Sequence, residues 1–349
     1  MKRMRSLILA AAAVGLASFA LVGRPADATG AKMAAAADEF LASLTPEEKQ
    51  KASYPFDDKH RLAWFFTPQQ DKQKRFTRIG ARLEEMTPAQ KTAALGLLKT
   101  GLSAKGFEQA KTIMSLEGIL HDLEGNKGAM VRNTGWYFVS VFGKPSSTGS
   151  WGWRFEGHHM SVNYTLDKGE VIAATPLMFG ANPADVKGGE RKGLRTLPGI
   201  EDHARALIKS LSDDQVKVAK QPTPPGYEKV WEIKENNARP GVGAPIGVTA
   251  DKLTDDQRKT LMTLLQTYAD RMPEDLAATE MKRAKGTEPA KLYFAYTGST
   301  TPGQPYTYRI QAPEFVVEFL NVQADSANNK ANHIHSAWRR IPADFGLAE

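Results

Sequence analysis

The chain contains no cysteine and only seven histidines among its 349 residues. Without cysteine it has no disulfides, no thiolate metal site and no cysteine nucleophile. It also lacks a Gly-x-Ser-x-Gly elbow, which argues against a serine hydrolase. No basic stripe is interleaved with aromatic residues, so we expect no nucleic-acid partner. Stability must therefore come from a packed core, and a chain of this length can bury a large one.

The one long apolar run lies at the N-terminus. Lysine and arginine at positions 2, 3 and 5 precede the apolar run 7–22, and Ala26-Asp27-Ala28 matches a small-x-small cleavage pattern. We interpret 1–28 as a secretory signal peptide cleaved after Ala28. A retained anchor is the alternative, although the run is shorter than the ~20 residues of a membrane span. Removing this segment lowers the formal net charge from +7 to +4. We expect a periplasmic or secreted protein without a transmembrane segment.

Apolar periodicity and turn residues predict helices that flank two groups of strands. The helices are expected at 88–102, 103–123, 200–211, 255–269 and 273–285. Strands are expected at 136–142, 151–155, 159–166 and 171–174, and then at 292–296, 306–311 and 315–322. The stretches 222–226 and 238–247 are rich in proline and glycine and indicate loops. The pattern predicts an α+β fold with a mainly antiparallel sheet and helices packed on one face.

Four helix starts share one capping signature. The hydroxyl residues Thr45, Thr87, Ser212 and Thr254 each precede a Glu or Gln by three positions. This spacing predicts capping boxes, in which the hydroxyl and the later side chain satisfy each other's backbone amides. We do not infer an internal repeat, because the sequences after the caps diverge.

Two segments concentrate the histidines. In the first, strand alternation places Glu156 with His158 on one face, and His159 with Asn163 on the other. Met160, Val162 and Tyr164 would follow His158 into the core, although a bulge at Gly157 could reorient His158. The second segment is His333-Ile334-His335, whose imidazoles would point to one side of a strand with Cα atoms about 6–7 Å apart. Neutral imidazoles at such spacing suit divalent metals. Histidines bonded to backbone carbonyls are the alternative.

Other polar residues are weaker candidates. Glu117 and His121 are spaced to chelate on a helix, but they also fit an ordinary exposed pair. Trp151 and Trp153 share a strand face and would form either a stacking platform or part of the core. Asn182, in a predicted turn at 180–183, and Asn163 are candidate ligand contacts. Guanidinium groups pair bidentately with carboxylates, so Arg154 and Arg339 are the expected contacts for a substrate anion.

Linked blocks of sequence resemble a bacterial family. The blocks are 116–120, 137–143, 151–161, 180–184, 305–310 and 332–339, and they resemble the "domain of unknown function 3500" family from about residue 36 to residue 346. The resemblance implies a single domain over 29–349. It implies no established activity, so no catalytic role is carried over.

These observations support two hypotheses. The first is a metal-dependent hydrolase, with zinc the expected metal, in which His158 or His159, His333 and His335 bind the ion. Glu156 and His159 would supply acid–base chemistry, and a small-molecule or oligomeric substrate would be held by the arginines. An oxidative metal site, or an acid–base pair without metal, could use the same residues. The second hypothesis is a non-catalytic periplasmic ligand-binding protein with structural histidines.

Overall fold

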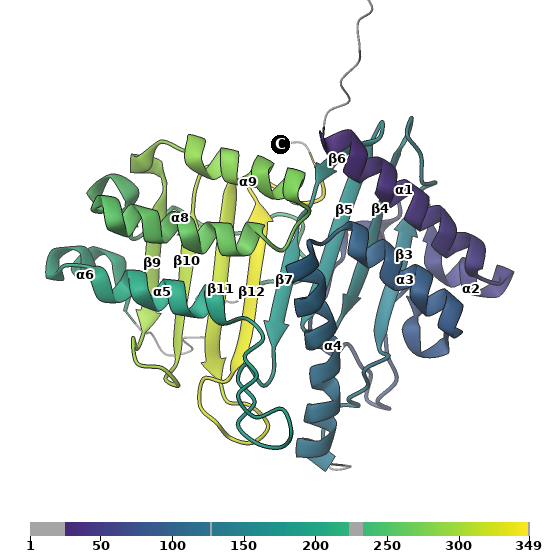
Figure 1. Ribbon diagram of the computed structural model, residues 1–349, viewed down its shortest axis with the longest axis horizontal. Helices are drawn as coiled ribbons and strands as arrows, with labels where there is room; N and C mark the ends of the chain where they lie inside the picture. The colour runs from purple at the N-terminus through teal and green to yellow at the C-terminus, as the bar shows by residue number, and fades with distance from the viewer. Residues whose placement is uncertain (1–24, 126–127, 223–232, 348–349) are drawn as a thin grey trace, which may run out of the picture.

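In the part of the chain that the structure describes, twelve strands form one sheet with helices across one face (Figure 1). The computed structural model describes residues 25–125, 128–222 and 233–347. The described helices are α1 (Pro25–Ser43), α2 (Pro46–Ala52), α3 (Pro88–Thr100), α4 (Ala104–Glu124), α5 (Pro198–Ser210), α6 (Asp213–Ala219), α8 (Asp255–Ala269) and α9 (Glu274–Gly286). The strands are β1 (Ser53–Tyr54), β2 (Ala81–Arg82), β3 (Tyr137–Phe142), β4 (Ser150–Gly157), β5 (Met160–Asp167), β6 (Glu170–Ala173), β7 (Leu177–Ala181), β8 (Val248–Thr249), β9 (Tyr293–Gly298), β10 (Tyr306–Gln311), β11 (Phe315–Gln323) and β12 (His333–Arg340).

The sheet is antiparallel except where β1 pairs with β3, so the predicted α+β class and sheet type are confirmed. Its order is β1-β3-β4-β5-β7-β12-β11-β10-β9-β8, and β2 and β6 pair with β3 and β5. Strands from both predicted groups therefore belong to the same sheet. Strand β7 was not predicted, because its short apolar run lies between two prolines and does not alternate. The loop at 238–247 is confirmed, and 222–226 lies outside the described residues after its first position.

The main core lies between the sheet and the helices. Met160, Val162 and Tyr164 are buried there as predicted, and Trp153 stacks on Tyr164 with ring centroids 5.0 Å apart. Trp151 and Trp153 are thus core residues. A smaller cluster on the other face contains Trp64, Phe66, Met178, Ile233, Leu320, Ala337 and Phe345. Within the described residues, no helix has the length and hydropathy that a membrane span requires.

All four predicted capping boxes are present. The contacts between them reveal a structural repeat that was not evident from the sequences that follow the caps. Gln90 donates to Ser43 O and to Glu48, and Gln257, 167 positions later, donates to Ser210 O and Gln215 with the same sequence separations. Both glutamines join two helix starts. Inferring no repeat was therefore wrong: side chains after the caps diverge, whereas the contacts between the caps recur.

The strands repeat in the same way. The pair Ser140–Arg154 between β3 and β4 corresponds to Ala295–Arg309 between β9 and β10, 155 positions later. The order β3-β4-β5-β7 from one side of the sheet is matched by β9-β10-β11-β12 from the other. Because β7 and β12 are antiparallel neighbours, the two halves are related by an approximate twofold axis through this central pair. We call them the first half and the second half.

Candidate metal centre

The tight turn between β4 and β5 presents two histidines. His158 and His159 are its two residues, and His159 has a left-handed φ of 62°. The His159 N–H donates to Phe66 O and the Gly180 N–H donates to His159 O, both at 2.8 Å. The turn also changes which side chains share a face of the sheet, compared with the prediction from simple alternation. Glu156 pairs with Ser161 and therefore shares the face of Ser161, not that of Met160, because alternation does not continue through a two-residue turn.

The sheet brings the second histidine segment to this turn. Strand β7 lies between β5 and β12, and Gly180 on β7 pairs with His335 on β12. A Cβ on Gly180 would lie 3.1 Å from His159 Cδ2 and 3.3 Å from its Cβ. The absence of a side chain at Gly180 therefore leaves room for the His159 ring beside β12.

Three imidazoles converge at this point. Each of His159, His333 and His335 offers one ring nitrogen, and these atoms lie within 4.8 Å of one another. The Nε2 atoms of His159 and His333 are 2.8 Å apart, and the ring of His335 packs edge-on against Phe66. This group, which we call the histidine cluster, can hold a metal ion. The structure thus brings together three of the four predicted metal-ligating histidines.

The environment keeps these imidazoles neutral. Burial lowers the pKa of His159 and of His333 well below the ordinary histidine value, and the neighbouring imidazoles lower both further. Burial also lowers the pKa of His335 to about 3, with a smaller contribution from His158. Neutral imidazole is the form that donates a lone pair to a metal. The cluster is therefore ready to bind a cation at neutral pH.

His158 lies beside the cluster and has other partners. Its ring stacks on that of His159 with centroids 3.7 Å apart, and its Nδ1 contacts the Glu117 carboxylate from α4. Arg132 lies 3.4 Å from the same Nδ1 and also pairs with Glu124 at 2.8 Å. A buried carboxylate thus orients His158, in the manner of groups that support metal ligands.

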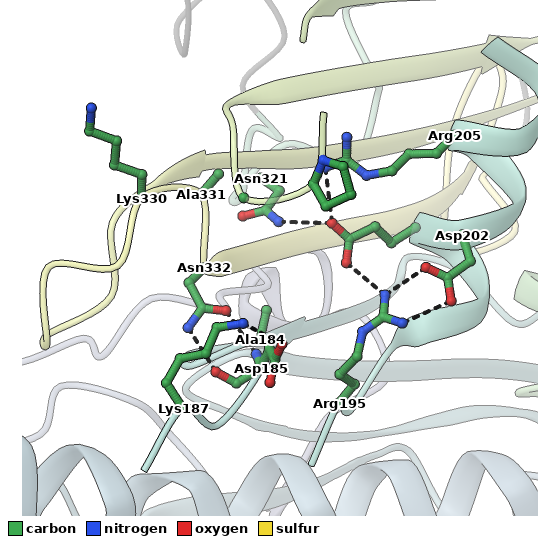
Figure 2. A pocket seen from close by; sticks show the side chains of 13 residues that line it. Ala184, Asp185, Lys187, Arg195, Asp202, Arg205, Asn321, Lys330, Ala331 and Asn332 are labelled. Atoms are coloured by element: carbon green, nitrogen blue, oxygen red, sulfur yellow. Dashed lines mark hydrogen bonds and ion pairs between the residues drawn. The ribbon is translucent and has the colours of Figure 1, made fainter. Parts of the chain in front are cut away.

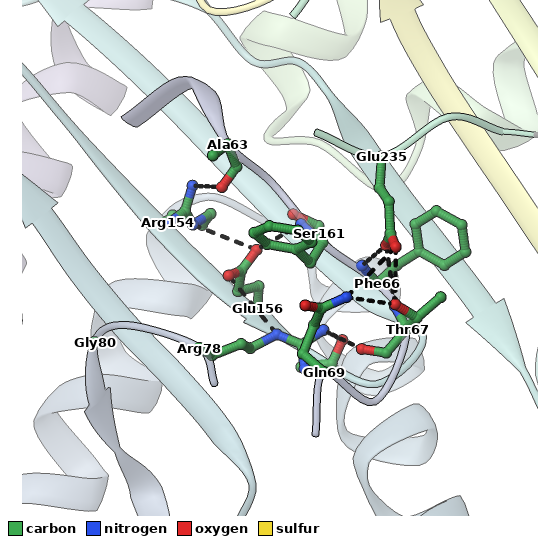
Figure 3. A network of polar contacts seen from close by, with 12 residues as sticks. Ala63, Phe66, Thr67, Gln69, Arg78, Gly80, Arg154, Glu156, Ser161 and Glu235 are labelled. Carbon is green, nitrogen blue, oxygen red and sulfur yellow. Dashed lines mark hydrogen bonds and ion pairs between the residues drawn. The ribbon is translucent and has the colours of Figure 1, made fainter. Parts of the chain in front are cut away.

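The predicted base Glu156 lies on a different network (Figure 3). It accepts from the Phe65 N–H at 3.0 Å, and its oxygens are 3.7 Å from Arg78 Nε and 3.4 Å from Arg154 Nε. Arg154 also donates to the carbonyls of His60 and Ala63. Within the described residues, no contact joins Glu156 to an imidazole.

Of the remaining predicted contacts, Arg339 and Asn163 are held by other partners. Arg339 pairs with Asp344 at 2.7 Å, lies over the Trp64 ring, and is four residues along β12 from His335, roughly 13 Å by strand rise. Asn163 donates to Pro176 O at 2.9 Å. Asn182 follows β7 directly; its side chain is buried and its oxygen has no hydrogen-bond partner in the described part of the chain.

A cavity of about 300 Å³ lies near His333, at the ends of β11 and β12 (Figure 2). Asn321, in its wall, accepts from the His333 N–H at 3.1 Å. The arginines of this cavity already have carboxylate partners: Arg195 pairs with Asp202 at 2.7 Å, and Arg205 with Glu201 at 3.2 Å. The positive charges of these two arginines are therefore largely neutralised by carboxylates of the protein.

Sequence reasoning missed or undervalued several residues of this region. Glu117 had been paired with His121 on the basis of helical spacing, but it points into the protein beside Leu116 and Leu120. A glutamate within an apolar helix stripe was the available signal, since such a group needs a buried partner. Arg78 and Phe66 lie in an irregular segment, and no sequence pattern connects them to β4 or β12.

The fold and the site define an α+β protein with a three-histidine centre at the end of its sheet. The model of the protein family of unknown function DUF3500 matches residues 26–347. The chain belongs to this family, as its sequence blocks indicated. No curated protein and no solved structure matches the chain.

Proposed function

We propose that the histidine cluster binds a divalent metal ion, with zinc as the resident metal, and that the protein is a metal-dependent hydrolase. The convergence of three neutral ring nitrogens from two distant segments is the observation that supports this proposal. Zinc prefers imidazole nitrogen at about 2.0–2.1 Å, and three protein ligands leave a fourth position for water or substrate.

The ring nitrogens of the cluster lie 2.8 Å apart for His159 and His333 and within 4.8 Å for all three residues, so small shifts of the rings would bring them to the spacing that zinc requires. Tetrahedral ligands at that bond length lie roughly 3.3 Å from one another. The Nε2 atoms of His159 and His333 are 2.8 Å apart, so a small separation of these two rings would accommodate the ion. Their contact without metal is a hydrogen bond in which one ring donates and the other accepts.

The protein's own contribution to hydrolysis comes from the groups beside the cluster. A bound zinc ion would supply a water of lowered pKa and polarise the scissile bond. The Glu117–His158 pair is the nearest ionisable pair, and Glu117 fixes the orientation of a ring that stacks on His159. We therefore assign the acid–base role to His158, with Glu117 as its positioning residue, in place of Glu156.

Metal content tests the first part of the proposal. Purified wild type, His333→Ala and the control His121→Ala would be analysed by inductively coupled plasma mass spectrometry after zinc loading and desalting. His121 is exposed on α4 and serves as a matched histidine outside the cluster. We expect about one zinc per chain in wild type and control, and loss in His333→Ala. Metal-free wild type would favour the non-catalytic ligand-binding alternative.

Cobalt substitution tests whether the site is open, as hydrolysis requires. A cobalt-loaded protein with an exchangeable water should change its visible spectrum on addition of azide, whereas a closed structural site should not. A spectrum insensitive to azide and pH would contradict the hydrolase proposal while leaving metal binding intact.

We also propose that the chain is exported and cleaved after Ala28. This point falls inside α1, and the next two residues, Thr29 and Gly30, are buried. Met33, Ala37 and Phe40 then pack into the main core. Cleavage there would keep every one of these packed residues. Mass spectrometry of the periplasmic fraction should find a chain that begins at Thr29.

A further inference from the structure

A second cavity, of about 440 Å³, lies next to Arg78 and Arg154 on the face of β4 opposite the main core. Its wall includes Phe65, Glu156 and the exposed Lys59, so the cavity reaches the surface. Phe66, the neighbour of Phe65, contacts His335, so this segment separates the cavity from the histidine cluster. We call it the arginine cavity; Figure 3 shows its polar network.

The charges in the arginine cavity are not balanced by direct hydrogen bonds. The Arg78 terminal nitrogens donate to the carbonyls of Pro68 and Gly157 at 3.0 and 3.2 Å, and Arg154 Nη1 donates to Ala63 O at 2.8 Å. Both Nε atoms are buried without a hydrogen-bond partner in the described part of the chain. Glu156 lies between them and forms ion pairs at 3.4 Å with Arg154 Nε and 3.7 Å with Arg78 Nε, but it makes a hydrogen bond to neither. Among the described residues, Glu156 is the one carboxylate within ion-pair distance of these two buried guanidinium groups.

Glu235 is a second carboxylate in the neighbourhood, but it is already engaged. It accepts from the Phe66 N–H at 3.0 Å and from the Thr67 hydroxyl at 2.9 Å. Among the described residues it contacts neither arginine of the cavity. Glu235 therefore acts on Arg78 only through space, and it leaves the Nε donors of both arginines without a hydrogen-bond acceptor in the described residues.

The second half provides an internal comparison. There Arg309, the counterpart of Arg154, pairs with Glu318 at 2.7 Å. The counterpart of Glu156 is Gln311. The β2–β3 pair Ala81–Val139 corresponds to the β8–β9 pair Val248–Phe294, so the position equivalent to Arg78 is Pro245. At the positions equivalent to Arg78, Arg154 and Glu156, the second half thus has a single arginine, and this arginine pairs with Glu318. The first half carries an additional cation, which the repeated fold itself does not require.

We propose that the arginine cavity binds a small organic carboxylate with an apolar body. Its carboxylate would lie between the two arginines and accept from the Nε donors, since guanidinium groups recognise carboxylates through paired N–H groups. Ala63, Phe65 and Ile79 line the cavity and would contact the apolar part of the ligand. The volume is that of a small-molecule site. This inference does not depend on a metal.

Benzoate is a suitable probe, and benzamide is its neutral counterpart. Isothermal titration calorimetry on EDTA-treated protein should show saturable binding of benzoate with a millimolar or lower Kd, at least about tenfold tighter than benzamide. Arg154→Gln should weaken benzoate binding by about tenfold or more. The control Arg75→Gln, which removes an exposed arginine paired with Asp71, should leave it unchanged.

Glu156→Gln gives a change in the opposite direction. It removes the competing carboxylate and should tighten benzoate binding severalfold. Gln311 stands at the equivalent position of the second half, so the fold accommodates the substitution. A purely structural Arg–Glu–Arg network predicts no benzoate binding, or weaker binding in Glu156→Gln. Either result, or equal binding of benzamide, would overturn the inference. Because the titration uses EDTA-treated protein, a failure of this inference is distinguishable from a failure of the metal-binding proposal.

Discussion

The Nε2 atoms of His159 and His333 lie 2.8 Å apart although 174 positions separate the two residues in the chain. Their meeting depends on the central strand order, in which β7 holds the β4–β5 turn on one side and β12 on the other. The two histidines come from opposite halves of the repeated fold. The histidine cluster is therefore built across the approximate twofold axis, and neither half contains all three of its histidines.

Zinc should stabilise the folded protein through this cluster. A ligand that binds the folded state alone contributes roughly 2.7 kcal/mol at a hundredfold excess over its Kd. For a chain of this size we expect a rise in Tm of roughly 5 °C, reversed by EDTA. Differential scanning fluorimetry with zinc and magnesium would measure it. Magnesium should have little effect, since it prefers oxygen ligands.

His333→Ala should abolish the zinc-dependent rise in Tm, while His121→Ala should retain it. An equal rise in both variants would place the stabilising metal elsewhere in the chain.

Stability should fall as the pH drops below about 6.5, the ordinary histidine pKa. Burial lowers the pKa of His335 to about 3, so between these values the unfolded chain binds a proton that the folded chain does not. His159 and His333 have pKa values lowered in the same direction. Each such histidine makes the unfolding free energy fall by at most about 1.4 kcal/mol per pH unit in this range. Urea unfolding of EDTA-treated protein at pH 7, 6, 5 and 4 would measure this slope.

His335→Asn removes one of these titrating groups, so its unfolding free energy should depend less steeply on pH than that of wild type. Gln73→Ala, an exposed substitution that removes no titratable group, should keep the wild-type slope. Identical slopes for His335→Asn and wild type would show that His335 does not bind its proton differently in the two states.

Local sequence patterns predicted much of this architecture. The helix at 255–269 and all four capping boxes were predicted, because caps and periodicity act within a few residues. The spacing of His333 and His335 on one strand indicated a candidate metal-ligating pair. Their convergence with His159 could only be proposed, since it depends on β7, whose short run gave no strand signal.

Two predicted site residues have partners that the sequence did not indicate, and the physical cause is the same for both. Glu156 was expected beside the histidines, but the turn at His158–His159 ended the alternation that placed it there. Arg339 was expected to hold a substrate, but Asp344, five residues later, supplies its partner. Sequence shows that a group is charged. Only the folded chain shows which partner a buried charge has.

Gly180→Ala should disturb the cluster without altering any ligand. Its Cβ would lie 2.6 Å from Ile334 O and 3.1 Å from His159 Cδ2, so the β7–β12 contact and the His159 ring must move. We expect a loss of about 1–3 kcal/mol in unfolding free energy, together with weaker zinc binding. Gly96→Ala is the matched control. Nothing lies within 4 Å of a Cβ there, and alanine in α3 should stabilise by up to about 1 kcal/mol. Urea unfolding and zinc titration would compare the two, and unchanged zinc affinity in Gly180→Ala would contradict the packing argument.

The repeated glutamine contacts should contribute equally to stability. Gln90 and Gln257 are buried, and each accepts from its N-cap amide and donates to a carbonyl 47 positions earlier. Alanine at either position leaves these groups without their partner, so each variant should lose about 1–2 kcal/mol of unfolding free energy. Because the two sites lie in different halves, the double variant should lose the sum to within about 0.5 kcal/mol. Urea unfolding would measure all three, with the exposed Gln73→Ala as control. If alanine at one of the two positions left the unfolding free energy unchanged, the repeated contacts would not contribute equally to stability in the two halves.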